Sequence, residues 1–471
     1  MGKIWYNYFN KIKNYEYIGA PMTFDFEKGR QTMKTKYLKR FPIGNPHRAW
    51  KQDKFILSTF SPTCVFYNKF KDNPDAYEIA RKSVKTCADA GFNLVEMGWA
   101  TPAASEAALP ACEALGLDII YQNLAICGGM QNRIGFDENP EPRKDIQKIV
   151  SDLKKYRHVI GYYIWDEPYM PDQLAEARRQ MDMFQDYDPS ALLFTVAIPS
   201  YNKEYKWRNG LFPVYLRDFI EKLDPAVLSL DYYPVGMKEH DETRQCDESL
   251  MWCDLGLMKK LSAEYNMPMW FYYQGQNLHN VDFFVFPMVR MFMHAGILYG
   301  AKGLQHYTAA GAVVEEFTGE HGIFFEEQKQ IHAEIRELGN TLMALDCKRV
   351  FHDASLLPGS TYTEGLHNDI SESEHLLGEL PYRVSASESE DEYGNKYLTV
   401  LNRDYIEAKK FTLELKADSR VYEVSKKDGV HYVVAESTKQ IEVELQPGDM
   451  VLYRIQPADE EAFNIDYVLE K

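Results

Sequence analysis

The sequence lacks three features that mark well-known functional classes. Positive charge is not in excess: 53 Lys and Arg stand against 70 Asp and Glu, a net charge of −17. That balance argues against nucleic acid or an anionic membrane as a partner. No segment reaches about 20 uninterrupted apolar residues, so we expect no membrane-spanning helix. No GxGxxG or GxxxxGK[ST] pattern occurs, which disfavours a nucleotide-binding doubly wound sheet.

Cysteine is also used in a way that excludes common structural roles. The seven cysteines are scattered, odd in number and contain no CxxC pair. This pattern argues against a disulfide framework or a zinc cluster and suits a reducing compartment. The N-terminal residues contain no apolar run of signal-peptide length. We therefore expect a cytoplasmic protein, or a secreted one if a leader has been removed.

Short apolar runs alternate with helix-like stretches from Phe55 to about residue 345, the pattern of βαβ units and a parallel sheet. Eight strands are expected, which predicts an α/β fold with a (β/α)8 TIM barrel. The doubly wound open sheet is the alternative. The expected strands are Phe55–Pro62, Asn93–Trp99, Asp118–Ala125, Val159–Trp165, Leu192–Ile198, Val227–Tyr233, Pro268–Gln274 and Gly303–Thr308.

The rest of the chain divides around this barrel. Residues 1–50 are predicted to be an extension that packs on the barrel of residues 51–345. Closely spaced alternating strands then predict a small all-β sandwich over residues 346–471. Its expected strands lie between Lys396 and Ile455, and the acidic runs Ser371–Glu374 and Ser385–Glu392 are expected to be solvated loops.

The segment Gly161–Pro168 is the most informative part of the barrel. It predicts a buried strand that ends on Asp166 and Glu167, where barrel enzymes carry their catalytic groups. By strand alternation Glu167 shares a face with Tyr163 and Trp165, whose rings would desolvate its carboxyl group. Desolvation raises a carboxyl pKa, as a proton donor at neutral pH requires. Glu167 is therefore the candidate general acid.

The other strand ends carry acids, amides, a histidine and aromatic rings, and no lysine or arginine. A phosphate or carboxylate ligand normally needs a cation, so this composition predicts a neutral carbohydrate substrate. We expect stacking from Trp99, Trp165, Tyr273 and Tyr307, and hydrogen bonds to sugar hydroxyls from Gln274, Gln276 and His306. Glu96 and Asp166 would orient the sugar or the acid, and Asn123 and Tyr233 complete the expected site.

Glycoside hydrolysis needs two carboxyl groups. Asp231 is the expected second one, with Asp166 and Glu96 as alternatives. Its strand lies two ladder steps from that of Glu167, roughly 9–10 Å between backbones. We therefore expect the wide carboxyl separation of inverting enzymes.

Other chemistries stay open at this point. Glu96, Asp166, Asp231 and His306 would be the ligands of a metal site, but they lack a ligand spacing such as HExxH. We therefore expect no metal and no cofactor. A lyase or epimerase and a non-catalytic carbohydrate-binding barrel are the alternatives from other classes. The oligomeric state is left open, with a homo-oligomer allowed.

The segment Gly161–Pro168, the run Asp231–Pro234, the strand that ends at Gln274 and the run Gly300–Tyr307 resemble the large retaining clan of (β/α)8 glycoside hydrolases, in particular uncharacterised gut-bacterial members. The resemblance implies that Glu167 is the acid/base and that the C-terminal sandwich is an accessory domain. Two departures stand against a simple transfer of mechanism. The clan usually has Asn where this chain has Asp166, and a nucleophilic Glu where this chain has Gln274. Asp231, or an acetamido group of the substrate, would then have to replace that nucleophile.

Overall fold

The computed structural model describes most of the chain, and all the described residues belong to one compact unit, Met33–Lys471. The described ranges are 33–34, 43–62, 75–98, 102–122, 142–201, 211–236, 248–278, 281–356 and 367–460. The expected N-terminal extension therefore lies outside them up to residue 42, apart from residues 33–34.

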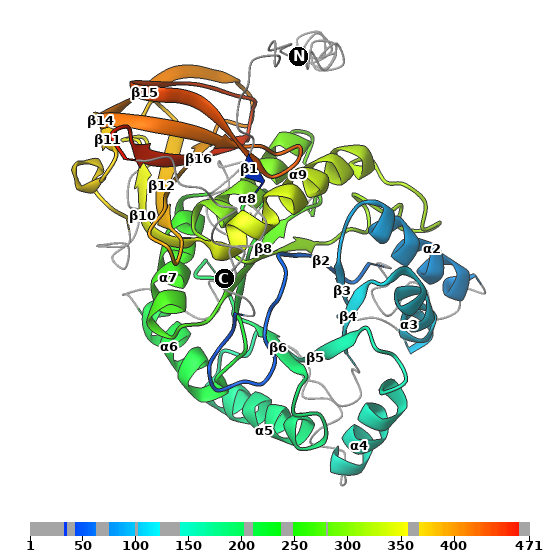
Figure 1. Ribbon diagram of the computed structural model, residues 1–471. Coiled ribbons are helices and arrows are strands. Elements are labelled where there is room, and N and C mark those ends of the chain that lie inside the picture. Colours follow the sequence, from blue (N-terminus) through cyan, green and yellow to red (C-terminus); the bar gives the residue numbers. More distant parts are fainter. Residues whose placement is uncertain are drawn as a thin grey trace. The chain divides into compact units, whose positions relative to one another are not determined.

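Eight parallel strands form a closed barrel, as predicted, and a helix follows each strand on its outer side (Figure 1). Neighbouring strands pair in parallel around the barrel, and the ring closes where Ala197 bridges Leu230, with Ala197 N–H donating to Ser229 O at 2.8 Å. The strands are β2 (Ile56–Phe60), β3 (Leu94–Glu96), β4 (Asp118–Tyr121), β5 (Val159–Asp166), β6 (Leu192–Val196), β7 (Leu228–Tyr232), β8 (Met269–Gln274) and β9 (Gly303–Tyr307). The helices are α2 (Ala76–Asp89), α3 (Pro102–Leu115), α4 (Pro142–Leu153), α5 (Pro171–Tyr187), α6 (Phe212–Leu223), α7 (Ser249–Glu264), α8 (Phe286–Leu298) and α9 (Phe325–Ala344).

The two faces of the barrel wall are packed into separate cores. One cluster lies between the strands and the helices, and a second fills the inside of the barrel with rings such as Phe194, Trp270 and Tyr272. Buried apolar surface contributes roughly 25 cal/mol per Å² to folding. Strands that are buried on both faces read as continuous apolar runs, which is why their positions could be predicted.

An all-β domain follows the barrel, as predicted. Its strands belong to one continuous antiparallel sheet that folds over its own apolar core. The strands are β10 (Asp346–His352), β11 (Leu376–Leu377), β12 (Val384–Glu390), β13 (Lys396–Asn402), β14 (Lys409–Val424), β15 (Val430–Leu445) and β16 (Met450–Pro457), with the short β1 (Met33–Lys34) at the edge beside β15. The long strands β14 and β15 pair with each other across irregularities in their register.

The prediction of a solvated loop over Ser385–Glu392 was wrong. Most of this run is strand β12, which pairs with β10 and β13. Glu388 is 4% exposed and accepts hydrogen bonds from Ser373 Oγ at 2.5 Å and His375 N–H at 3.0 Å. Local polar partners therefore let an acidic sequence occupy a buried strand.

A segment that we call the strap, residues 43–54, crosses the end of the barrel where the strands begin. Gln52 Nε2 donates to Lys302 O at 2.7 Å, and Trp270 Nε1 donates to Gln52 Oε1 at 2.9 Å. Trp50 packs edge-on against Trp270, with ring centroids 6.1 Å apart. The strap thus covers part of the barrel interior from below.

Helix α8 packs against the all-β domain. Arg290 Nε donates to Pro447 O at 3.0 Å, and His294 Nδ1 lies 2.9 Å from Gly448 O. Gly448 has φ of +71°, and a Cβ there would lie 2.3 Å from Pro287 O. Only glycine fits both the left-handed backbone and this close approach. Among the described helices none is long and apolar enough to cross a membrane.

Arg48 is the side chain of the strap whose removal should destabilise the fold most. It is 7% exposed and donates to Leu223 O at 2.8 Å and to Asp224 O at the end of helix α6, and to Gln185 Oε1 near the end of helix α5. Arg48→Ala removes the donor that these acceptors share, and Leu223 O keeps the longer bond from Arg178 Nη1 at 3.3 Å, so we expect the free energy of unfolding to fall by about 2–3 kcal/mol. Denaturant unfolding followed by circular dichroism measures the change.

Arg81→Ala is the matched control for this prediction. Arg81 forms an exposed ion pair with Glu78 on helix α2, and such pairs contribute little to stability. We expect its unfolding midpoint to equal that of the wild type. An Arg48→Ala protein as stable as Arg81→Ala would contradict the structural role of the strap.

Candidate active site

Three carboxyl groups meet at the end of the barrel where the parallel strands finish. Asp166 ends β5 and Glu167 follows it, while Asp231 lies near the end of β7. Strand β6 lies between these strands. Because the carboxyl ends of parallel strands point into one mouth, side chains distant in sequence come together there.

The backbone at Glu167 is held in an unusual conformation. Its φ is +52°, a left-handed region that costs a residue other than glycine on the order of 1–3 kcal/mol. Thr195 Oγ1 donates to Trp165 O at 2.7 Å on one side of this turn. Tyr215 OH donates to Pro168 O at 3.2 Å on the other side. The turn that carries Glu167 is therefore fixed by hydrogen bonds from two neighbouring elements.

The carboxyl groups of Glu167 and Asp231 form a hydrogen bond with each other. They are 7% and 6% exposed. Burial raises the pKa of Glu167 well above its usual value, and the charges of Asp231 and Asp166 raise it further. Burial and Asp166 also raise the pKa of Asp231 to about 7, although hydrogen bonds with Glu167 and Tyr233 oppose this rise. Two carboxyl groups in contact cannot both be ionised at low cost, so we expect the pair to hold one proton between them.

This contact contradicts the expected wide separation of the two carboxyl groups. The expectation used the spacing of the strand backbones alone. In the structure the left-handed turn at Glu167 takes its carboxyl group out of the regular strand geometry, and the carboxyl groups of Glu167 and Asp231 meet. The pair is therefore closer than the ~6.5–9.5 Å of inverting enzymes.

Asp166 adds a third carboxyl group beside the pair. It is partly exposed and accepts a hydrogen bond from Tyr163 OH at 2.9 Å. Tyr163 points into the barrel, where its ring packs against Phe60 and Phe194. Asp166 is thus held from inside the barrel, and its charge acts on both members of the pair.

Two tyrosines form an aromatic wall next to Asp231. Tyr233 stacks on Tyr307 with ring centroids 4.7 Å apart and an interplanar angle of 26°. Both rings are partly exposed, and Phe60 packs against Tyr307 at 5.5 Å. Tyr233 also makes a hydrogen bond with Asp231. An aromatic face thus lies beside the paired carboxyl groups.

Glu96 lies below the mouth, inside the barrel. It is fully buried and accepts hydrogen bonds from Ser58 Oγ at 2.6 Å, Gln305 Nε2 at 2.9 Å and Tyr272 OH. Burial raises its pKa to about 7, against the effect of the hydrogen bonds from Gln305 and Ser58. Because its oxygens already accept from these donors, Glu96 supports the site from within. This position differs from the expected contact with a sugar.

Three predicted site residues lie on the helix-facing side of the barrel wall. Trp165 and Tyr273 belong to the core between strands and helices. His306 packs between Phe92 and Tyr273, at 5.7 and 5.2 Å, and burial lowers its pKa to about 3. The expectation that these side chains line the mouth was therefore wrong. For Trp165 the reason is a register shift between Tyr163 and Trp165, which puts the two rings on opposite faces of β5.

The amides at the end of β8 already have partners in the protein. Gln274 is fully buried; its Oε1 accepts from Val235 N–H at 2.8 Å and its Nε2 donates to Val235 O at 3.1 Å. It therefore fastens the segment after β7 and is not free for a sugar hydroxyl. Gln276 is partly exposed and donates to Thr308 Oγ1 at 3.3 Å. Trp99 and Asn123 lie outside the described residues.

Sequence reasoning missed Tyr201, which lies in the segment after β6. It is 7% exposed and packs edge-on against Tyr232. Burial raises its pKa well above the usual value, and the charges of Asp231 and Glu167 raise it further. The predicted strand Leu192–Ile198 could have led to it, had the residues after that strand been included. In the described ranges no three His, Cys, Asp or Glu side chains are arranged to hold a metal ion.

Comparisons with known proteins bear on the fold. No family model and no curated protein sequence matches the chain. A solved structure described as a glycoside hydrolase is 13% identical, with a TM-score of 0.52 over 89% of this chain and 97% of that one. A glycoside hydrolase family 5 structure from Bacteroides vulgatus is 12% identical, with a TM-score of 0.49 over 93% of this chain and all of that one. The first likeness is one of fold: the chain has a (β/α)8 barrel of the kind found in glycoside hydrolases.

Proposed function

We propose that the protein is a glycoside hydrolase that cleaves a neutral oligosaccharide or polysaccharide. The observation that carries the proposal is the buried, hydrogen-bonded pair of Glu167 and Asp231 at the end of the barrel strands. Hydrolysis of a glycosidic bond needs one protonated and one ionised carboxyl group. A pair that shares a single proton supplies both at neutral pH.

The roles within the pair follow from their environments. The pKa of Glu167 is raised well above the usual value, so Glu167 keeps the shared proton and donates it to the oxygen of the leaving group. The leaving-group oxygen would replace Asp231 as the acceptor of that hydrogen bond. Asp231 then carries the negative charge opposite the positive charge that develops on the sugar ring.

The surroundings of the pair support a neutral sugar. The stacked rings of Tyr233 and Tyr307 offer an apolar face beside Asp231, and aromatic faces pack well against the C–H face of a sugar. In the described part of the chain no lysine or arginine is among the groups that set the pKa of Glu167 or Asp231. An anionic sugar would meet three carboxyl groups there without a compensating cation.

A non-catalytic carbohydrate-binding barrel is the second candidate. The observation that favours it is Gln274. This amide lies at the end of β8, where the clan that the chain resembles has its nucleophile, and it is hydrogen-bonded to Val235. Such a protein would bind oligosaccharides without releasing sugar. It would also keep its affinity when Glu167 is changed to glutamine.

Removal of the acid tests the proposal directly. Glu167→Gln keeps the size of the side chain but has no proton to donate, so we expect kcat/KM on natural oligosaccharides to fall by about 10²–10⁴-fold. Aryl glycosides with a dinitrophenolate leaving group need little protonation, so their hydrolysis should fall much less. Equal losses on both substrate types would contradict the role of Glu167 as the acid.

The pH dependence of kcat/KM should report the shared proton. Activity should rise with pH as Asp231 ionises and fall again as Glu167 loses its proton. Because the charge of Asp166 raises the pKa of both groups, Asp166→Asn should move both limbs of the profile to lower pH. The asparagine Oδ1 can still accept the hydrogen bond from Tyr163.

Asp89→Asn is the control for this charge change. Asp89 is paired with Lys85 on the last turn of helix α2, at the other end of the barrel. We expect its pH profile to match that of the wild type. If the profile of Asp166→Asn stays in place or moves to higher pH, the charge of Asp166 does not raise the pKa values of Glu167 and Asp231.

The anomer of the first product tests the role of Asp231. Carboxyl groups in contact are nearer to the ~5 Å of retaining enzymes than to the inverting range, so we now expect direct attack by Asp231 and retention. Proton NMR of the anomeric signals during early turnover measures this. An inverted first product would instead assign Asp231 to the activation of a water molecule.

A further inference from the structure

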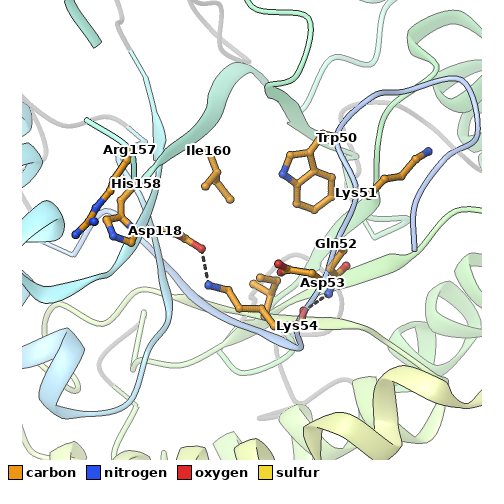
Figure 2. A pocket seen from close by; sticks show the side chains of 10 residues that line it. Trp50, Lys51, Gln52, Asp53, Lys54, Asp118, Arg157, His158 and Ile160 are labelled. Atoms are coloured by element: carbon orange, nitrogen blue, oxygen red, sulfur yellow. Dashed lines mark hydrogen bonds and ion pairs between the residues drawn. The ribbon is translucent and has the colours of Figure 1, made fainter. Parts of the chain in front are cut away.

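The end of the barrel opposite the mouth contains a separate cavity. It is half open to solvent and has a volume of about 420 Å³ between the strap and the first residues of β2, β4 and β5 (Figure 2). Ile56 and Ile160 contribute apolar surface, and Trp50 stands across the cavity from Ile160. A volume of about 300–1,000 Å³ is typical of small-molecule sites, so this cavity can hold one or two sugar rings.

The polar side chains at this cavity are held in place by ion pairs. Asp118 lies 2.5 Å from Lys54 Nζ and 3.0 Å from His158 Nδ1. Arg157 Nε lies 2.8 Å from Glu113. Lys54 and His158 thus contact Asp118 from the two sides of the cavity.

Two polar groups face the cavity without a partner in the described part of the chain. Figure 2 shows the ring nitrogen of Trp50 and the carboxylate of Asp53 directed toward the open space. The indole N–H is a donor and the carboxylate is an acceptor. Trp50 itself is held from behind by its edge-on contact with Trp270.

The cavity is not an extension of the mouth. Its residues lie at the beginnings of the barrel strands, whereas Glu167 and Asp231 lie at their ends. Between the two ends the barrel is filled by buried side chains such as Leu94, Ile120 and Tyr163. A ligand in the cavity would therefore bind independently of the catalytic pair.

We propose that this cavity is a second carbohydrate-binding site that takes a neutral sugar residue. Its lining has the basic side chains Lys51, Lys54 and Arg157, the imidazole of His158, and the acidic side chains Asp53 and Asp118. This near balance of charge favours a neutral ligand over a strong anion or cation. A sugar hydroxyl both donates and accepts, so it can use the carboxylate and the N–H groups together, while an indole and two isoleucines suit the C–H surface of the ring.

Fluorine NMR of the full chain with 5-fluorotryptophan at its seven tryptophans gives a readout specific to this site. Trp50→Phe identifies the signal of Trp50. The probes are glucose, galactose, N-acetylglucosamine, cellobiose and lactose at millimolar concentration. We expect at least one of them to shift the Trp50 signal in a saturable way. Inorganic phosphate and tetramethylammonium, as charged probes, should leave it in place.

Variants separate this site from the mouth. Asp53 is exposed and has no ion pair with described residues, so Asp53→Ala should fold normally, keep wild-type hydrolysis and weaken sugar binding at the Trp50 signal by roughly tenfold. Glu167→Gln should leave that binding unchanged. The proposal fails if no sugar shifts the signal, if only the charged probes do, or if Asp53→Ala binds as well as wild type. Because hydrolysis is measured separately, these outcomes leave the catalytic proposal untouched.

Discussion

The proton shared by Glu167 and Asp231 is the constraint on which the candidate site depends. Two buried carboxyl groups in contact are tolerable only while one of them is neutral, because repulsion between two charges would be strong in a site shielded from water. The arrangement therefore stores a proton on an acid that would be ionised in water. It also requires an accurate backbone, since a small displacement would separate the two groups. The left-handed turn at Glu167, with its hydrogen bonds from Thr195 and Tyr215, supplies that accuracy.

The interior of the barrel extends this support downward. Tyr272 lies beside Asp231 in the register of β7 and β8, and its hydroxyl group donates to Glu96. Glu96 also accepts from Ser58 and Gln305, and Ser229 Oγ donates to Gln305 at 2.7 Å. One buried network thus joins β2, β3, β7, β8 and β9 directly below the mouth. Buried polar networks of this kind are costly unless every member is satisfied, and a satisfied one fixes a unique arrangement.

Regular patterns could be predicted from the sequence, and local irregularities could not. All eight barrel strands were predicted because each is an apolar run bounded by turn residues, and Glu167 was found because its acid follows such a run directly. The side of the barrel wall was predicted wrongly for Trp165, since one extra residue in β5 reverses the alternation after Tyr163. The contact between Glu167 and Asp231 could not be predicted either, because a positive φ at a glutamate leaves no mark in the sequence. The acidic strand β12 was missed because the groups that satisfy Glu388, such as Ser373, come from outside the strand itself.

Gln274 connects these observations. A glutamate at this position could accept from Val235 N–H, but it could not donate to Val235 O and would bury a further negative charge. The amide satisfies both backbone groups and so fastens the segment that continues from Asp231 and Tyr233. In this chain the end of β8 therefore positions the segment after β7, and the two carboxyl groups come from the ends of β5 and β7. The amide at Gln274 and the contact between Glu167 and Asp231 are thus two consequences of one arrangement. Strand β6 lies between the strands that carry the two acids, and β8 holds the segment that follows β7 through Gln274 and Val235.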